Sequence, residues 1–475
     1  MTRYFIGIDN GSQSSKVSVF DEHGHVVSVA RRALRPYDTP RPGVVEHPDD
    51  DLWTSIGAAA GEAMAAFPGD PADIVGVGLC TIRFCRAVLK ADGTLAQPVM
   101  SWMDARVSRP YERETPDAAY VTTSSGYITH RMTGQFRDTA ANYAGMWPLD
   151  SDTFDWKTDD AGIAELGLDR SMLFDLVQPG AILGTVTEAA AAHTGIPAGL
   201  PVVATANDKA VEALGCGLRS DDTLLVSLGT YVAGMTTGSR NVTDSADFWT
   251  NYAATPHAYL YESYGVRRGM WTVSWYRDLL GEEAAGPARE AGISPEEYIN
   301  RQAALVPPGS DGLITVLDWL APTEAPHRKG SILGFDGRQG RFHIYRSILE
   351  GLALTIGETA GKMAAELGTD FKEVIVSGGG SASDVMMQIF ADVFGVPARR
   401  SAVADAAGLG SVITAAVATG TYPDFDTAID AMVRPGETFT PAPAEHALYT
   451  KLQKIHSEAR RHTDGIYVES YELFG

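Results

Sequence analysis

A carboxylate, Asp208, stands where a predicted strand gives way to a predicted helix. Residues 201–206, PVVATA, are apolar or small and predict a buried strand; Asn207 and Asp208 interrupt it, and helical spacing starts at Lys209. In open α/β sheets, ligands lie beyond the carboxyl ends of the strands, so an aspartate there can reach a bound hydroxyl group. Two interpretations stay open on this stretch alone. Asp208 is either the N-cap of the helix or a group that acts on a ligand.

Three polar turns that follow predicted strands could hold a nucleotide. In the first, which joins strands 4–8 and 17–20 into a hairpin, small residues would let backbone N–H groups approach a phosphate closely. Lys16 adds a mobile positive charge there, and Asp9 can hold a hydrated magnesium ion, although an ordinary hairpin turn has the same composition. The other two turns follow LLVSL and VIVS. The candidate nucleotide-binding residues are Gly11, Ser12, Gln13, Ser14 and Lys16 in the first turn, Gly229 and Thr230 in the second, and Gly378, Gly379, Gly380 and Ser383 in the third.

Residues 99–106 suggest a surface for a sugar. If they are extended, a period of two places Trp102, Asp104 and Arg106 on one face. An aromatic ring can pack against the C–H face of a carbohydrate, while an acceptor and a guanidinium bind its hydroxyl groups. A half-buried strand that contains a salt bridge fits the same residues.

The loop after the predicted strand 74–80 is the second candidate sugar contact. It contains Arg83, Phe84 and Arg86, and two guanidinium groups with an aromatic ring suit a polyhydroxylated or an anionic ligand. A solvated loop has a similar composition. The positive charge suggests the hypothesis that the acceptor is carboxylated or otherwise extended.

The arrangement of these turns predicts the fold class. Strand-and-turn units near the start, past the midpoint and late in the chain predict two related α/β domains that hold a nucleotide between them. A single dinucleotide-binding domain would instead show GxGxxG after its first strand, and that motif is absent there. Helical spacing predicts helices over residues 52–67, 341–367 and 406–418, and the tail beyond Arg434 is predicted to be polar and peripheral.

The composition restricts the partners. The 475 residues include 38 Lys and Arg against 60 Asp and Glu, a net charge of −22 that disfavours nucleic acid and anionic membrane surfaces. Three cysteines are too few for a disulfide scaffold, and no apolar run reaches the length of a membrane span or of a signal core. We therefore expect a cytoplasmic protein of ordinary two-domain size, with neither nucleic acid nor membrane as a partner; a homodimer fits the sequence as well as a monomer does.

Taken together, the motifs resemble those of the FGGY carbohydrate kinases, which include xylulokinases and glycerol kinases. The resemblance covers almost the whole chain, and the ordered set of motifs is highly specific. The matching stretches are GIDNGS through Lys16, PGVVEHPDDDLW, WMDAR, MTG, GTVTEAAAAHTGIPAGLPVVA, Asp208 with the residues up to Gly217, LGT, SGGGS, and GSILGF followed by HIYRSILEG.

The resemblance implies a fold, a reaction and roles for the candidate residues. The fold would be two actin-like ATPase (ribonuclease H-like) domains with a cleft between them, a sugar-binding domain at 1–218 and a nucleotide-binding domain at 219–475. Asp208 would be the general base of an ATP-dependent sugar or polyol kinase, acting on a ketopentose-like or alditol substrate, with Mg²⁺ near Asp9. The sugar would lie against Arg83, Phe84, Trp102, Asp104 and Arg106. The turns at 11–14 and 229–230 would hold phosphates, and the turn at 378–383 would receive the adenosine.

Two departures from the family pattern bear on the substrate. The segment between Arg106 and the MTG run is shorter than usual, and Thr81-Ile82-Arg83-Phe84 replaces the Gly-Gln-Met-His typical of xylulokinases. An alternative function is therefore an actin-like ATP-binding switch or interaction protein with a degraded sugar site. A nucleotide-dependent oxidoreductase is a more distant alternative.

Overall fold

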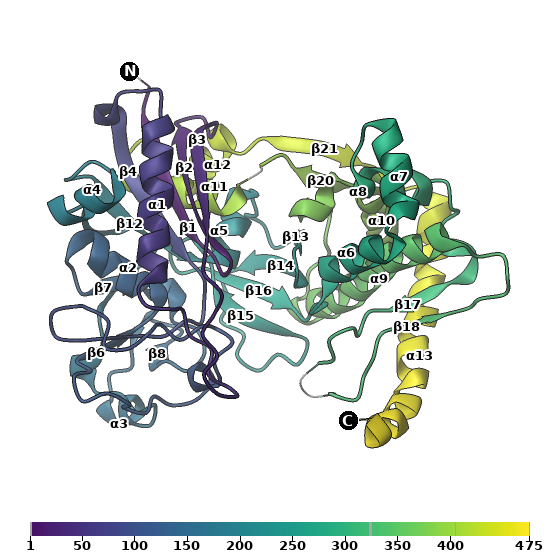
Figure 1. The fold of residues 1–475 in the computed structure, drawn as a ribbon, viewed down its shortest axis with the longest axis horizontal. Coiled ribbons are helices and arrows are strands. Elements are labelled where there is room, and N and C mark those ends of the chain that lie inside the picture. The colour runs from purple at the N-terminus through teal and green to yellow at the C-terminus, as the bar shows by residue number, and fades with distance from the viewer. Residues whose placement is uncertain (1, 323–324, 404, 475) are drawn as a thin grey trace.

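Two large sheets organise the chain. A computed structural model describes residues 2–322, 325–403 and 405–474, and the two sheets lie beside each other in it (Figure 1). The first sheet has the strand order β11 (Ile182–Thr185), β12 (Pro201–Asn207), β4 (Ile74–Thr81), β1 (Tyr4–Asn10), β2 (Ser14–Asp21) and β3 (Val26–Ala33). The second has the order β15 (Phe248–Tyr252), β16 (Tyr259–Ser263), β14 (Val232–Gly238), β13 (Thr223–Leu228), β19 (Glu373–Ser377), β20 (Ala398–Ser401) and β21 (Pro435–Phe439).

The second sheet repeats the strand pattern of the first. In the first, β1 pairs antiparallel with β2 and parallel with β4; β2 is antiparallel to β3, β4 parallel to β12, and β12 antiparallel to β11. The strands β13, β14, β19, β16, β20 and β21 pair in the same senses, and β15 is added beyond β16. This repetition matches the prediction of two related α/β domains, and the predicted N-terminal hairpin is confirmed as β1 and β2.

Helices cover these sheets. The helices of the first 220 residues are α1 (Asp51–Ala66), α2 (Ser124–Thr133), α3 (Asp160–Ala164), α4 (Glu188–Thr194) and α5 (Asp208–Gly215). Later come α6 (Gly269–Leu280), α7 (Glu282–Ala291), α8 (Pro295–Ala303), α9 (Arg341–Leu367), α10 (Asp384–Phe394), α11 (Ala406–Ala418), α12 (Phe425–Met432) and α13 (Pro443–Phe474). Two-stranded pairs complete the fold: β5 (Ala87–Leu89) with β6 (Tyr120–Thr122), β7 (Arg137–Thr139) with β10 (Asp175–Val177), β8 (Leu149–Asp150) with β9 (Asp155–Trp156), and β17 (Ile314–Val316) with β18 (Ser331–Leu333).

The strands of the first sheet are apolar on both faces because each face carries helices. Along β1, Phe5 belongs to the core that includes α11, whereas Ile6 and Ile8 belong to the core that includes α1. Between them, Gly7 has no side chain, and a Cβ there would lie 2.6 Å from the carbonyl oxygen of Gly408 in α11. The strand and this helix from late in the chain therefore pack backbone to backbone.

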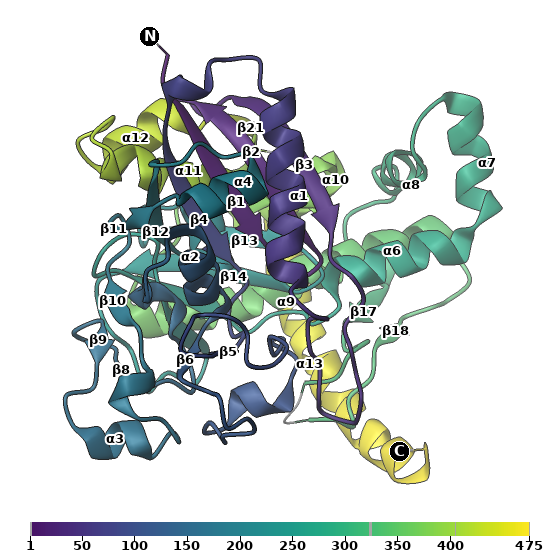
Figure 2. The ribbon, with the colours of Figure 1, turned by 60° about the vertical axis from the view of Figure 1, so that its left-hand side comes forward.

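The C-terminal part of the chain contains more structure than the sequence predicted. The helices at 341–367 and 406–418 form with the predicted bounds, and α1 lies within one residue of its prediction. The prediction of a polar and peripheral tail beyond Arg434 agrees with the exposure of this segment but does not include its structure: β21 joins the edge of the second sheet, and α13 packs against α9 and α10. Figure 2 shows α11 and α12, both from beyond residue 400, against the first sheet, and α13 running along the second half of the molecule. Tyr449 and His456 are the parts of α13 that are fully buried.

Candidate active site

Three strand ends of the first sheet meet at one edge. The parallel register pairs Asn10 of β1 with Thr81 of β4, and Thr81 with Asn207 of β12. The turn at 11–13, the loop that carries Arg83 and the start of α5 therefore leave the sheet side by side. This is the edge at which parallel strands present ligand-binding residues.

Asp208 is the first residue of α5 and does not cap it. The cap is Asn207, whose side-chain oxygen accepts from the Ala210 N–H at 3.2 Å, so of the two interpretations of Asp208 the N-cap is wrong. In the part of the chain that the structure describes, the Oδ1 of Asp208 accepts only from the N–H of Lys209, at 3.0 Å. Burial raises the pKa of Asp208, while the charges of Arg83 and Lys209 oppose that rise. Asp208 is thus a partly buried carboxylate of increased basicity that does not cap the N-terminus of α5.

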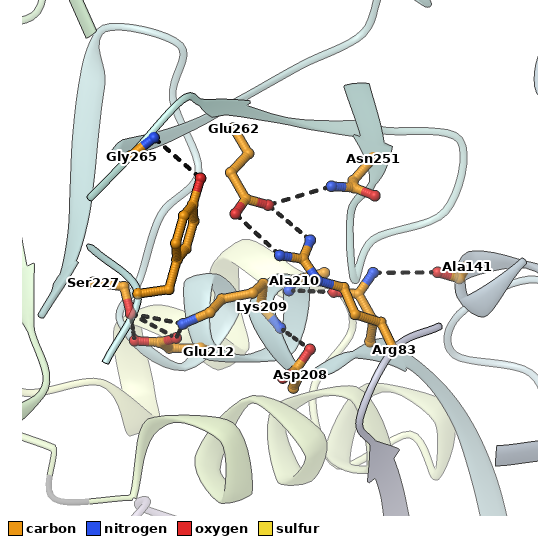
Figure 3. A network of polar contacts seen from close by, with 12 residues as sticks. Arg83, Ala141, Asp208, Lys209, Ala210, Glu212, Ser227, Asn251, Glu262 and Gly265 are labelled. Atoms are coloured by element: carbon orange, nitrogen blue, oxygen red, sulfur yellow. Dashed lines mark hydrogen bonds and ion pairs between the residues drawn. The ribbon is translucent and has the colours of Figure 1, made fainter. Parts of the chain in front are cut away.

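A partly buried ion pair that was not predicted from the sequence lies within the first turns of α5 (Figure 3). Lys209 Nζ donates to Glu212 Oε2 at 2.9 Å and to Ser227 Oγ at 2.8 Å. Glu212 also accepts from the hydroxyls of Ser227 and Ser377, at 2.8 and 2.6 Å to Oε1. Since Ser227 is the second-last residue of β13 and Ser377 is the last residue of β19, this pair joins α5 to the second sheet. The sequence does contain a sign of this pair, because a Lys and a Glu three residues apart on a predicted helix can form an ion pair.

A second group of charges surrounds Asp9. Burial and the neighbouring Asp405 raise the pKa of Asp9 to about 7, while Lys16 lowers it. Lys16 Nζ donates to Asp405 Oδ1 at 3.2 Å, and Asp405 also accepts from Ser18 Oγ. Asp405 caps α11, so the cluster lies where β1, β2 and that helix meet.

The residues around Asp9 fit a hydrated divalent cation. Three further carboxylates, those of Asp405, Asp208 and Glu212, act on Asp9 through their charge, and a cation would relieve that repulsion. Within the described part of the chain, no three His, Cys, Asp or Glu side chains are close enough to hold a metal by themselves. That is the situation expected for Mg²⁺, which usually binds through one or two carboxylates, water and substrate phosphates.

The two predicted turns of the second half lie next to each other. The register pairs Ser227 with Ser377, so the Gly229 and Gly378 turns follow neighbouring strand ends. Gly378 has φ of +85°, and a Cβ on it would lie 2.4 Å from the carbonyl oxygen of Leu228. This contact requires glycine. Thr230 and Gly379 are exposed, which leaves both turns open to a ligand.

Residues 99–106 do not form the predicted strand. Met100 pairs with Arg86, the chain then turns, and Asp104 caps a 3₁₀ helix, Ala105–Ser108. Arg106 is buried and donates to Asp104 at 2.7–2.9 Å, and to Glu46 and Glu114. The salt bridge that the sequence left open is therefore present, and it braces the turn that carries the exposed ring of Trp102.

Arg83 and Phe84 lie at the same edge, close to Asp208. The side chain of Phe84 is partly buried, and its backbone has φ of +65°. Both terminal nitrogens of Arg83 bind Glu262 of β16, a partner that the sequence analysis missed (Figure 3). A lone glutamate in a strand gave no signal of this contact.

Comparison with known proteins identifies matching domains over most of the chain. The model of the N-terminal domain of the FGGY family of carbohydrate kinases matches residues 4–113 and 108–215, and that of the C-terminal domain matches 224–419. The two N-terminal matches meet where the segment after Arg106 is predicted to be shortened. An uncharacterized sugar kinase of Escherichia coli, YgcE, is 50% identical over 472 residues, 99% of this chain and 96% of its own.

Solved structures at lower sequence identity share the fold. A gluconate kinase from Lactobacillus acidophilus has a TM-score of 0.85 at 20% identity, over 99% of this chain and 100% of its own. A ligand-bound xylulose kinase from the same organism has a TM-score of 0.84 at 20% identity, over 98% and 99% of the two chains. These likenesses confirm the predicted fold of two actin-like ATPase domains. Among the described residues, no helix is both long enough and apolar enough to cross a bilayer.

Proposed function

The chain belongs to the FGGY family of carbohydrate kinases and is an ATP-dependent sugar kinase, and from that premise we propose that Asp208 is its general base. The carboxylate takes the proton of an acceptor hydroxyl while the hydroxyl oxygen attacks the γ-phosphorus of ATP. The bond from that phosphorus to the bridging oxygen breaks, and ADP leaves. The observation that carries this proposal is the state of Asp208: raised pKa, a place at the shared strand edge, and no part in capping α5.

The nucleotide occupies the turns that follow strand ends in the two sheets. Residues 11–14 with Lys16, and Gly229 with Thr230, bind phosphates, and residues 378–383 receive the adenosine. The exposed backbone of the second-half turns supports this assignment. Asp9 holds Mg²⁺ through water, and the ion, when bound, supplies charge neutralisation at the phosphates. The division into a sugar-binding domain, 1–218, and a nucleotide-binding domain, 219–475, belongs to the same proposal.

The acceptor is a sugar or polyol related to ketopentoses and alditols. The exposed ring of Trp102 offers a platform for its C–H face, and the Arg83 and Phe84 loop borders it on the side of Asp208. Asp104 and Arg106 act on the acceptor through the turn that they brace, because their own hydrogen-bonding groups are engaged with each other and with neighbouring carboxylates. The name of the xylulose kinase structure is in keeping with a ketopentose, and that of the gluconate kinase makes a sugar acid the alternative that the acceptor screen must include.

A screen for ADP release tests the reaction. Pentuloses, hexuloses, alditols and aldonic acids are assayed with Mg²⁺ and ATP, using the wild type, Asp208→Asn and the control Asp117→Asn, an exposed carboxylate away from the site. Loss of the base should lower kcat by about 10²- to 10⁴-fold, and the control should keep the wild-type rate. Full turnover in Asp208→Asn would exclude Asp208 as the base. ATP binding without turnover on any acceptor would instead favour the actin-like switch.

A further inference from the structure

A buried ion pair links the two halves of the molecule beside Asp208. Arg83 follows β4 of the first sheet, and Glu262 lies in β16 of the second. Arg83 Nη1 donates to Glu262 Oε2 at 2.7 Å, and Nη2 donates to Oε1 at 3.0 Å. The Glu262 side chain is fully buried and that of Arg83 is 13% exposed. Asn251 Nδ2 donates to the same Oε2 at 3.4 Å (Figure 3). A bidentate pair of this kind fixes the guanidinium in position.

Of the carboxylates that the structure describes, only Glu262 is hydrogen-bonded to Arg83, and Asp208 acts on Arg83 through charge. Its guanidinium carbon lies 5.3 Å from the centroid of the Phe84 ring and 5.6 Å from that of Trp249, so both rings attract the same charge. Burial opposes the charge, but Glu262, and more weakly Asp208, raise the pKa of Arg83, which stays protonated. The positive charge that the sequence suggested for binding an anion is thus already neutralised by Glu262.

The second arginine of this loop is engaged as well. Arg86 is buried, and its Nη1 and Nη2 donate to the carbonyl oxygens of Arg106 and Arg109 at 3.0 and 3.1 Å. Its guanidinium carbon lies 5.6 Å from the centroid of the Trp147 ring. Both terminal nitrogens of each arginine are thus already engaged, those of Arg83 with a carboxylate and those of Arg86 with two carbonyl oxygens.

We propose that Glu262 makes the acceptor site select uncharged sugars and alditols against sugar acids. Glu262 neutralises the guanidinium of Arg83 and holds both of its terminal nitrogens, and its own charge would repel a substrate carboxylate. This is selectivity by occupation and repulsion, achieved without a contact between Glu262 and the favoured substrate. The inference rests on the proposed placement of the acceptor beside Arg83 and Asp208. It replaces the hypothesis that Arg83 and Arg86 favour a carboxylated acceptor.

The test compares a five-carbon alditol with the five-carbon aldonate of the same configuration. Glu262→Gln keeps the side-chain volume but frees the charge of Arg83, so the ratio of kcat/KM for aldonate over alditol should rise at least tenfold relative to wild type. Arg83→Gln has the opposite consequence, because Glu262 is then unpaired, and its ratio should fall. The control is Glu373→Gln, which removes the carboxylate of a partly buried pair with Arg399 at another site and should leave the ratio unchanged.

Calorimetric binding of both acceptors to each protein separates this inference from the reaction itself. Wild-type protein that binds the alditol more tightly than the aldonate, with the order weakened or reversed in Glu262→Gln, supports the selectivity even if no acceptor is phosphorylated. Absence of phosphorylation would then count against the proposed function alone. Binding and kcat/KM ratios in Glu262→Gln within twofold of wild type, or a wild type that prefers the aldonate, would overturn the inference.

Discussion

Replacement of Glu212 by glutamine should destabilise the protein more than any change to an exposed ion pair. The substitution keeps the shape of the side chain but removes the charge that Lys209 faces at 2.9 Å. It also weakens the acceptor that Ser227 and Ser377 share. The charge of Lys209 would remain largely enclosed by protein, with the Ser227 hydroxyl and a neutral amide as its partners.

The expected magnitude follows from the burial of the pair. Breaking a buried ion pair by removal of one partner costs about 3–5 kcal/mol. The side chains of Lys209 and Glu212 are 21% and 16% exposed, so solvent screening places the cost nearer about 2–3 kcal/mol. For a domain of roughly 150–250 residues, such a loss of stability corresponds to a decrease in Tm of roughly 5–10 °C.

Differential scanning calorimetry at pH 7 measures this effect. The matched control is Glu282→Gln, because Glu282 and Arg289 form a pair that is 79% and 69% exposed and should contribute little. Adding Lys209→Met to Glu212→Gln removes the unpaired ammonium and should restore part of the lost Tm. A Tm for Glu212→Gln within 1 °C of wild type, or a double variant no more stable than the single one, would refute the reasoning.

The pH dependence gives the same experiment a second readout. Burial works to raise the pKa of Glu212, but Lys209 and the two serine hydroxyls lower it overall. A carboxyl group whose folded pKa is lowered contributes stability above its unfolded pKa and loses it as the pH falls through the folded value. The Tm difference between wild type and Glu212→Gln should therefore shrink on acidification below the ordinary range of a glutamate.

Two further predictions concern the Asp9 cluster and the contact between α5 and α11. The pKa of Asp9, raised from 3.8 to about 7, favours the protonated folded state, so its contribution to stability declines as the pH rises from about 4 to about 7. In EDTA, Asp9→Asn should therefore be more stable than wild type by up to about 4 kcal/mol above pH 7, and it should lose this advantage toward pH 4. The control Asp117→Asn should follow the wild type at every pH. Thermal unfolding that gives Asp9→Asn and wild type the same dependence of stability on pH would contradict this prediction. Gly215→Ala should lower the free energy of unfolding by about 1–3 kcal/mol, because its Cβ would lie 1.8 Å from the carbonyl oxygen of Ala406. The control Gly361→Ala, in an open stretch of α9, should raise it by about 1 kcal/mol. Equal free energies of unfolding in urea for the two variants would count against the packing argument.

Local periodicity predicted most of the elements that present the site. Apolar spacing, which is a property of each segment by itself, predicted the hairpin at the start, the strand and helix around Asp208, and the helices α9 and α11. The position of α11 could not be predicted in this way. Its contact with β1 depends on Gly7 and Gly408, which are 401 positions apart, and small residues indicate close packing without naming the partner.

The structure of residues 99–106 depends on hydrogen bonds that their own pattern does not reveal. Alternation over eight residues fits a strand, but it also fits a turn followed by a 3₁₀ helix. The second arrangement prevails because Asp104 accepts from the backbone N–H groups of Val45 and Arg106, at 2.8 and 2.9 Å. The bond from Val45, in a loop 59 residues earlier, cannot be predicted from periodicity, and neither can the pairing of Arg83 with Glu262, 179 residues later.

Helix α5 explains why these long-range contacts matter for the proposed reaction. Asp208 and Glu212 are four residues apart, so their side chains lie on one face of the helix, about one turn from each other. Glu212 is bonded to Ser227, two residues before the Gly229 turn, and to Ser377, directly before the Gly378 turn. The distance from the proposed base to the proposed phosphate turns therefore depends on one side chain. Glu212→Gln should for that reason lower kcat more than it raises KM, and a change confined to KM would show that the helix and the turns keep their spacing without this pair.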